Sequence, residues 1–257
     1  MRYSILDRIR GLTVVSMILY HAVWDLVYIF AIDWTWYRSI LAYVWQQSIC
    51  WTFILLSGFC WSFGRKKWKR GFIVFAAGIL ITAVTLIFMP GQRIVFGILT
   101  CLGSCMLLMI PLEKLLAKVP SIVWLLASVL LFMIFRNVNE GFLGFENFNF
   151  VKLPESLYQN KFMTYLGFME DGFYSTDYFS LLPWLFLFVT GYFMYRLVKE
   201  SGKLEKLATW NKTGSQERKK FHYLLTALEW IGRYSLLVYM VHQPIVYVVL
   251  WGVISIL

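Results

Sequence analysis

The sequence predicts an all-α fold, a polytopic bundle of about seven transmembrane helices with the N-terminus inside and the C-terminus outside. Three observations lead to this prediction. The 257 residues are 60% hydrophobic and 15% charged, whereas soluble domains carry about 25% charged residues. The apolar residues come in blocks of about 20, the length that crosses a hydrocarbon layer of about 30 Å. Basic residues concentrate in every second loop, which sets the orientation.

The apolar blocks are separated by polar segments. They cover residues 11–32, 41–63, 71–89, 94–110, 121–135, 179–197 and 231–257, of which the fifth block is short for a span. Lys and Arg gather before the first block and after the second, fourth and sixth blocks, so these segments are expected in the cytoplasm. The net charge of +10 therefore lies in loops between apolar blocks and does not indicate a nucleic-acid partner.

Two connecting segments are long. Residues 136–178 are expected outside, where their Phe, Tyr, Asn and Gly content suits packing over a site or stacking on a sugar; a connector with no direct role fits equally well. Residues 199–222 are expected to form a cytoplasmic linker near anionic lipid headgroups. The sequence shows no internal repeat, so we expect a single transmembrane domain, 1–257.

The first block carries several ionisable residues on one helical face. At about 100° per residue, Arg10 and His21 lie only about 20° apart, Asp7 and Asp25 lie within about 40° of His21, and Tyr28 joins the same stripe. His21 is expected near the bilayer midplane, with Asp25 one turn further out and within reach of its imidazole. Charged groups are costly in lipid, so these residues are expected to line an internal cavity.

This stripe suggests acid–base chemistry. A carboxylate that accepts one ring N–H of a histidine fixes the tautomer and raises the basicity of the other nitrogen. Arg10, at the cytoplasmic mouth, offers a fork for phosphate or carboxylate. A buried polar cluster that pins helices together is the alternative.

Polar residues in two other blocks lie at comparable depths. His242 is followed by Gln243 in the last block, and for His242 a site role and a structural role are equally supported. Gln47 lies near the level of Asp25, whereas Ser57, beside a glycine, is most simply a close-packing residue. The four cysteines lie in apolar blocks and are expected to pack there. They offer no complete ligand set, so no metal is expected.

Arg10 and His21, ten residues apart, resemble the R-x10-H signature of membrane acyltransferases that modify sugars. A wider set of pieces resembles bacterial proteins with the heparan-alpha-glucosaminide N-acetyltransferase catalytic domain. These pieces are LDRIRG (6–11), HAVWDL (21–26), LSGFCW (56–61), FGIL (96–99), DYFSLLPWLFLF (177–188) and SLLVYMVHQP (235–244). Members of that family commonly carry a histidine after the FGIL piece, where this chain has Thr100.

The resemblance implies transfer of an acyl group, usually acetyl from acetyl-CoA, to an acceptor on the far side of the membrane. It points to His21 as base or acyl carrier and to Arg10 as its electrostatic companion. We therefore expect an acyl-CoA-dependent acyltransferase of the bacterial cytoplasmic membrane, acting on an extracytoplasmic glycan or glycolipid hydroxyl or amine. A homodimer is left open. The expected catalytic residues are His21 and Asp25, and the expected binding residues are Asp7, Arg10, Tyr28, Gln47, Ser57, His242 and Gln243.

Two other functions fit the same residues. A proton-coupled transporter of a small polar solute would use His21, Asp25 and His242 as a relay, although the sequence lacks the inverted repeat typical of transporters. A non-enzymatic partner in an envelope-assembly complex is the third interpretation.

Overall fold

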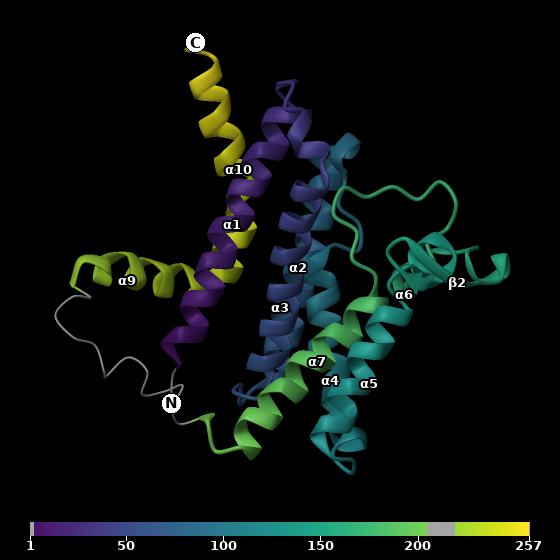
Figure 1. Cartoon of the computed structure of the whole chain (residues 1–257). Coiled ribbons are helices and arrows are strands. Elements are labelled where there is room, and N and C mark those ends of the chain that lie inside the picture. Colours follow the sequence, from purple (N-terminus) through teal and green to yellow (C-terminus); the bar gives the residue numbers. More distant parts are fainter. Residues whose placement is uncertain (1–2, 205–218, 257) are drawn as a thin grey trace. The chain divides into compact units, whose positions relative to one another are not determined.

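A computed structural model describes residues 3–204 and 219–256, without the side chains of 219–222 (Figure 1). The expected linker 199–222 thus lies mostly outside the described residues. The chain forms two compact units, one of residues 1–53 with 201–257 and the other of residues 54–200.

All seven predicted blocks form helices. Six of them are long and apolar enough to cross a membrane: α1 (Ser4–Tyr28), α2 (Ile40–Trp61), α3 (Lys67–Phe88), α4 (Ile98–Leu116), α7 (Leu181–Glu200) and α10 (Ser235–Ile254). The fifth block is α5 (Ser121–Ile134), whose 14 residues span roughly 21 Å, less than the hydrocarbon layer. The predicted all-α, multi-pass bundle is confirmed, whereas its orientation stays a prediction.

In the first unit, α1 packs against α10 and against α9 (Lys219–Arg233). The α1–α9 crossing requires a glycine on each helix. A Cβ on Gly11 would overlap the backbone carbonyl of Leu228, and one on Gly232 would overlap that of Asp7. A salt bridge of 2.6 Å between Arg8 and Glu229 holds the same crossing.

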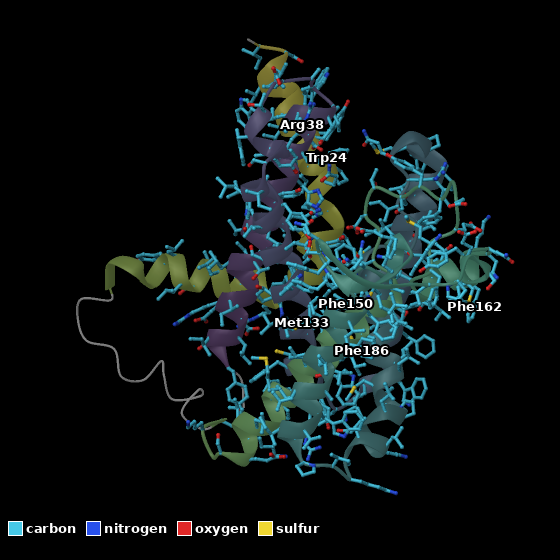
Figure 2. All side chains as sticks on the ribbon, turned by 45° about the vertical axis from the view of Figure 1, so that its right-hand side comes forward. Trp24, Arg38, Met133, Phe150, Phe162 and Phe186 are labelled. Carbon is cyan, nitrogen blue, oxygen red and sulfur yellow. The ribbon has the colours of Figure 1, made fainter. Side chains whose placement is uncertain are left out.

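The segment between α1 and α2 closes one end of the first unit. It contains the 3₁₀ turn η1 (Thr35–Arg38), in which Tyr37 is buried and donates its hydroxyl to the Tyr20 carbonyl at 3.4 Å. Burial raises the pKa of Tyr37, so the phenol keeps the proton that this bond needs. Trp24 and Arg38, labelled in Figure 2, belong to this end.

The second unit contains the rest of α2 with α3, α4, α5 and α7. Helix α3 packs on α4, and α7 packs on both α4 and α5. The α2–α7 contact again uses reciprocal glycines: a Cβ on Gly58 would overlap the Phe188 carbonyl, and one on Gly191 would overlap that of Leu55. The predicted close packing beside Ser57 is therefore present.

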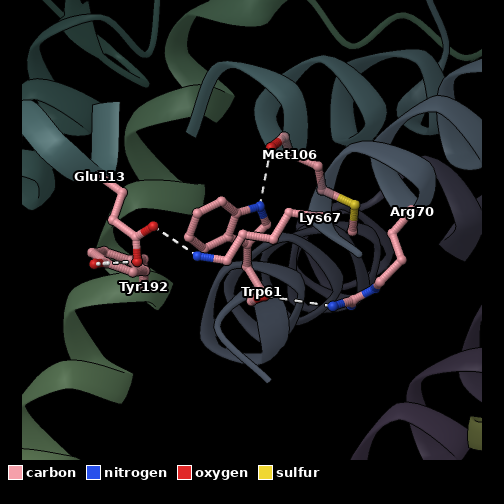
Figure 3. Close-up of polar contacts among 6 residues, drawn as sticks. All are labelled: Trp61, Lys67, Arg70, Met106, Glu113 and Tyr192. Carbon is pink, nitrogen blue, oxygen red and sulfur yellow. Dashed lines mark hydrogen bonds and ion pairs between the residues drawn. The ribbon is translucent and has the colours of Figure 1, made fainter. Parts of the chain in front are cut away.

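A polar network ties α2, α3, α4 and α7 together (Figure 3). Lys67 lies 3.8 Å above the Trp61 ring and forms a 2.7 Å salt bridge with Glu113, which also accepts the Tyr192 hydroxyl at 3.4 Å. The Trp61 indole N–H donates to the Met106 carbonyl at 3.0 Å. The cation is thus neutralised and stacked, as a partly buried lysine requires.

The segment 136–178 has more structure than the predicted loop. It contains η3 (Val138–Glu140), an antiparallel hairpin of β1 (Phe142–Phe145) and β2 (Phe148–Lys152), η4 (Glu155–Leu157) and α6 (Lys161–Leu166). The buried Asn137 amide supports the hairpin by donating to the Glu146 carbonyl at 2.6 Å and to Asn149 at 2.7 Å. Phe150 and Phe162 remain exposed (Figure 2).

Candidate functional site

Two histidines from different helices lie beside each other in the first unit. The rings of His21 on α1 and His242 on α10 have centroids 4.9 Å apart and planes inclined at 58°. The sequence placed both residues at a similar depth, and the α1–α10 packing brings them together. Two imidazoles in contact can share one proton or act successively on one substrate.

A carboxylate and an amide pair next to these rings. Asp25, one turn beyond His21, is fully buried and accepts a 2.6 Å hydrogen bond from the side-chain amide of Gln243. Gln243 directly follows His242, so α1 and α10 each contribute one histidine and one polar partner.

The tautomer of His242 follows from its hydrogen bond. Its Nδ1 lies 2.5 Å from the Tyr239 carbonyl oxygen, one turn earlier on α10. A carbonyl oxygen only accepts, so in the neutral ring Nδ1 carries the hydrogen and Nε2 has a lone pair. His242 is therefore oriented to accept a proton or a hydrogen bond through Nε2.

Three buried polar atoms of this cluster lack a hydrogen-bond partner among the described residues. They are Nε2 of His242, Oδ2 of Asp25 and Oε1 of Gln243. Leaving a buried polar atom unpaired costs about 1–3 kcal/mol, so each needs an explanation. Three acceptors in one cluster are chemically suited to a ligand with hydroxyl or amine donors. We call Asp25, Gln243, His21 and His242 the dihistidine cluster.

The structure gives Asp25 a different partner from the expected one. The i,i+4 spacing predicted a hydrogen bond from His21 to Asp25, but within residues 3–204 and 219–256 Asp25 bonds to Gln243. The neighbouring α10 supplies a better-placed amide donor. Spacing along one helix could not reveal that competitor, although the polar pair His242 and Gln243 was visible in the sequence.

The other expected residues of the first unit have partners outside this cluster. Arg10 forms a 3.2 Å salt bridge with Asp7 one turn earlier on α1. Tyr28, at the other end of α1, is exposed and packs on Trp24 with ring centroids 5.3 Å apart. Gln47 accepts the Trp51 indole N–H at 3.0 Å on its own helix. Ser57 belongs to the second unit, and its site role stays a prediction.

The second unit has a cavity of about 410 Å³. Its lining combines cations, carboxylates and hydroxyls, from Ser62, Glu113, Tyr192, Tyr195, Arg196, Lys199 and Glu200. Arg196 forms a salt bridge of 3.2 Å with Glu200, while Lys199 is exposed. The two carboxylates balance the two cations, so the cavity offers guanidinium and ammonium donors without a net positive charge.

The fold is that of a multi-pass helical membrane protein, with a buried cluster of two histidines, a carboxylate and an amide where two of its helices meet. A family model described as heparan-alpha-glucosaminide N-acetyltransferase, catalytic, matches residues 2–244. The chain therefore belongs to this membrane acetyltransferase family, and the resemblance seen in the sequence is confirmed. No curated protein and no solved structure matches the chain.

The sequence pieces that carried the resemblance divide between the units. LDRIRG, HAVWDL and SLLVYMVHQP supply Arg10 and the whole dihistidine cluster. In the second unit, Asp177 accepts the Ile98 backbone N–H at 3.2 Å at the start of α4, and Phe179 bonds to Phe96 at 2.8 Å. Thr100 is buried on α4 against Gly78 of α3.

Proposed function

We propose that the protein transfers an acetyl (acyl) group from cytoplasmic acyl-CoA to a hydroxyl or amine of an extracytoplasmic glycan or glycolipid, in the bacterial cytoplasmic membrane. The dihistidine cluster, with its three buried acceptor atoms, is the observation that carries this proposal. The cluster lies in the sequence pieces that resemble an acetyltransferase family. Its three unpaired atoms can accept hydrogen bonds from the hydroxyl or amine of a substrate.

The reaction requires two proton transfers, one from the acyl acceptor and one to the departing CoA thiolate. A histidine of the pair takes the proton from the acceptor hydroxyl or amine as its oxygen or nitrogen attacks the thioester carbonyl. The carbon–sulfur bond then breaks, and the same imidazolium returns the proton to the CoA thiolate. His21 is the proposed base, or the carrier of the acyl group in a two-step route. His242 presents Nε2 to the shared proton.

Asp25 and Gln243 are proposed to hold the acceptor. Their mutual hydrogen bond fixes both side chains. One oxygen on each is left to accept a hydrogen bond from the hydroxyl or amine groups of the glycan substrate. A site that is built to bond a substrate donor rejects analogues that lack it, because its buried oxygens then stay unpaired. In the second unit, the segment 136–178 carries exposed aromatic side chains suited to stacking on a sugar.

Two groups of cations are proposed contacts for the phosphates of the donor. Arg10, held by Asp7, keeps donors on its guanidinium that one salt bridge does not use. The cavity with Arg196 and Lys199 is the candidate in the second unit. Arg10 belongs to the first unit and the cavity to the second, so the two proposed phosphate contacts can be tested separately.

The test is acyl transfer by the purified protein in lipid nanodiscs. Acetyl-CoA thioester consumption is measured against a panel of envelope glycans, for the native protein and for His21→Ala and His242→Ala. We expect each variant to lose about 10²–10⁴-fold in rate, the usual worth of general acid–base catalysis. Val241→Ala, at an exposed position next to His242, is the matched control and should keep full activity.

Two outcomes would contradict the proposal. Near-normal transfer by both histidine variants would remove the cluster from the chemistry. Proton-coupled solute uptake into vesicles that depends on His21, with no thioester consumption, would establish the transporter instead.

A further inference from the structure

Helix α9 has an amphipathic surface that its packing leaves partly uncovered. One face lies against α1, through Gly232, Leu228 and the salt-bridged Glu229. At about 100° per residue, Tyr223, Ala227 and Trp230 fall within about 60° of one another on a different face, and Leu224 lies about 60° from Ala227, at the edge toward Leu228. Tyr223 is 83% exposed, Trp230 57% and Leu224 56%. We call Tyr223, Leu224, Ala227 and Trp230 the apolar face of α9.

The chain connection fixes where this face can lie. A single residue, Tyr234, separates α9 from α10, a helix long and apolar enough to span the membrane. The C-terminal end of α9 therefore lies at the membrane boundary. Figure 1 shows that α9 runs across α1 and α10 rather than along them, and its 15 residues cover roughly 22 Å, too short to cross the bilayer.

The residue types match a bilayer interface. Tyr and Trp concentrate at the level of the headgroups, and amphipathic helices bury their apolar face to a depth of about 5–10 Å there. The sequence of α9 contains Lys219, Lys220 and Arg233 against one acidic residue, Glu229, which is already paired with Arg8. The surplus positive charge favours anionic headgroups.

We propose that α9 is an interfacial helix whose apolar face is buried in the cytoplasmic leaflet, beside anionic lipid headgroups. The reciprocal glycines and the Arg8–Glu229 salt bridge fasten it to α1. The helix that carries Arg10 and His21 is thereby held at a fixed depth relative to the leaflet. This inference needs the inside orientation of the N-terminus and does not depend on acyl transfer.

The test places one nitroxide label at a time in the full-length protein, with its four native cysteines replaced, in nanodiscs that contain anionic lipid. Leu224→Cys probes the apolar face, and Arg233→Cys, exposed and about 180° away around the helix, is the matched control. Relaxation by oxygen, which enriches in lipid, is compared with relaxation by a water-soluble nickel chelate.

We expect the ratio of oxygen to nickel relaxation to be severalfold higher at 224 than at 233. Exchanging the anionic lipid for a zwitterionic one should lower the ratio at 224. Equal ratios at the two positions would overturn the proposal, because the apolar face would then lie in water. Dipolar broadening between labels at 224 would overturn it in favour of a second copy of the chain as occupant.

Discussion

The hydrogen bonds at the dihistidine cluster give each of its residues a specific partner. The sequence predicted only that these polar residues lie inside apolar blocks. Asp25 satisfies one oxygen with Gln243, and His242 satisfies Nδ1 with the Tyr239 carbonyl. The sequence could identify these residues because polar groups inside apolar blocks are few and costly. It could not identify their partners, because helix neighbours depend on tertiary packing.

Asp25→Asn should separate substrate chemistry from folding. The asparagine oxygen can still accept from Gln243, so we expect stability to change little. Its amide nitrogen replaces an acceptor with a donor, which should slow acyl transfer about 5- to 150-fold, the worth of a 1–3 kcal/mol hydrogen bond. Single-turnover kinetics measure the rate, and calorimetry should show unchanged acyl-CoA affinity. A variant that loses donor binding instead would place the donor, rather than the acceptor, at Asp25.

Arg10→Lys should act on the donor. Arg10 lies about 16 Å along the helix from His21, so it is too far to touch the imidazole. Lysine keeps the charge and loses the two-pronged fork, and we expect acyl-CoA binding to weaken by about 1–3 kcal/mol. Lys199→Gln is the comparison for the cavity of the second unit. Calorimetry on both shows which cation contacts the donor, and full affinity in both would refute the proposed phosphate contacts.

Helices were predictable from the length of the apolar blocks, but their ends and crossings were not. The last block, 231–257, combined the final turn of α9 with α10, because Gly232, two residues before the change of direction at Tyr234, lies inside α9 and does not mark its end. The hairpin in 136–178 was missed because its order rests on the buried Asn137, which no spacing reveals.

Gly232→Ala should destabilise the first unit through the α1–α9 crossing. The added methyl group would overlap the Asp7 carbonyl, and overpacking of this kind costs about 1–3 kcal/mol. Gly252→Ala is the matched control, since nothing lies within 4 Å of its Cβ position; there alanine should be neutral or stabilise α10 by up to about 1 kcal/mol. Thermal unfolding in detergent gives the stability change of each variant. Equal unfolding temperatures for the two variants would show that α9 is not tightly packed on α1.

A single family model matches nearly the whole chain, whereas the structure divides the chain into two compact units. The family match covers residues 2–244 and thus both units, while the assignment of 1–257 to a single domain stays a prediction. Composition and block length predicted the multi-pass architecture because crossing the hydrocarbon layer constrains both.

Orientation is the prediction that links the site to its substrates, because it decides which ends of the helices meet acyl-CoA. The basic segments put the loop between α4 and α5 inside and the segment 136–178 outside. Lys118→Cys and Lys161→Cys place a thiol at exposed positions in these two segments. Cys50 is half-buried and the other three native cysteines are buried, so a Cys50→Ser background limits unwanted labelling.

We expect a membrane-impermeant maleimide to label the Lys161→Cys protein in intact cells and the Lys118→Cys protein only after the cells are opened. The physical reason is that translocating short, Lys- and Arg-rich loops across the membrane is disfavoured, so they stay on the cytoplasmic side. The reverse pattern would place α9 and Arg10 outside, and cytoplasmic acyl-CoA could then not reach Arg10. Labelling of both positions in intact cells would contradict the predicted number of crossings between them.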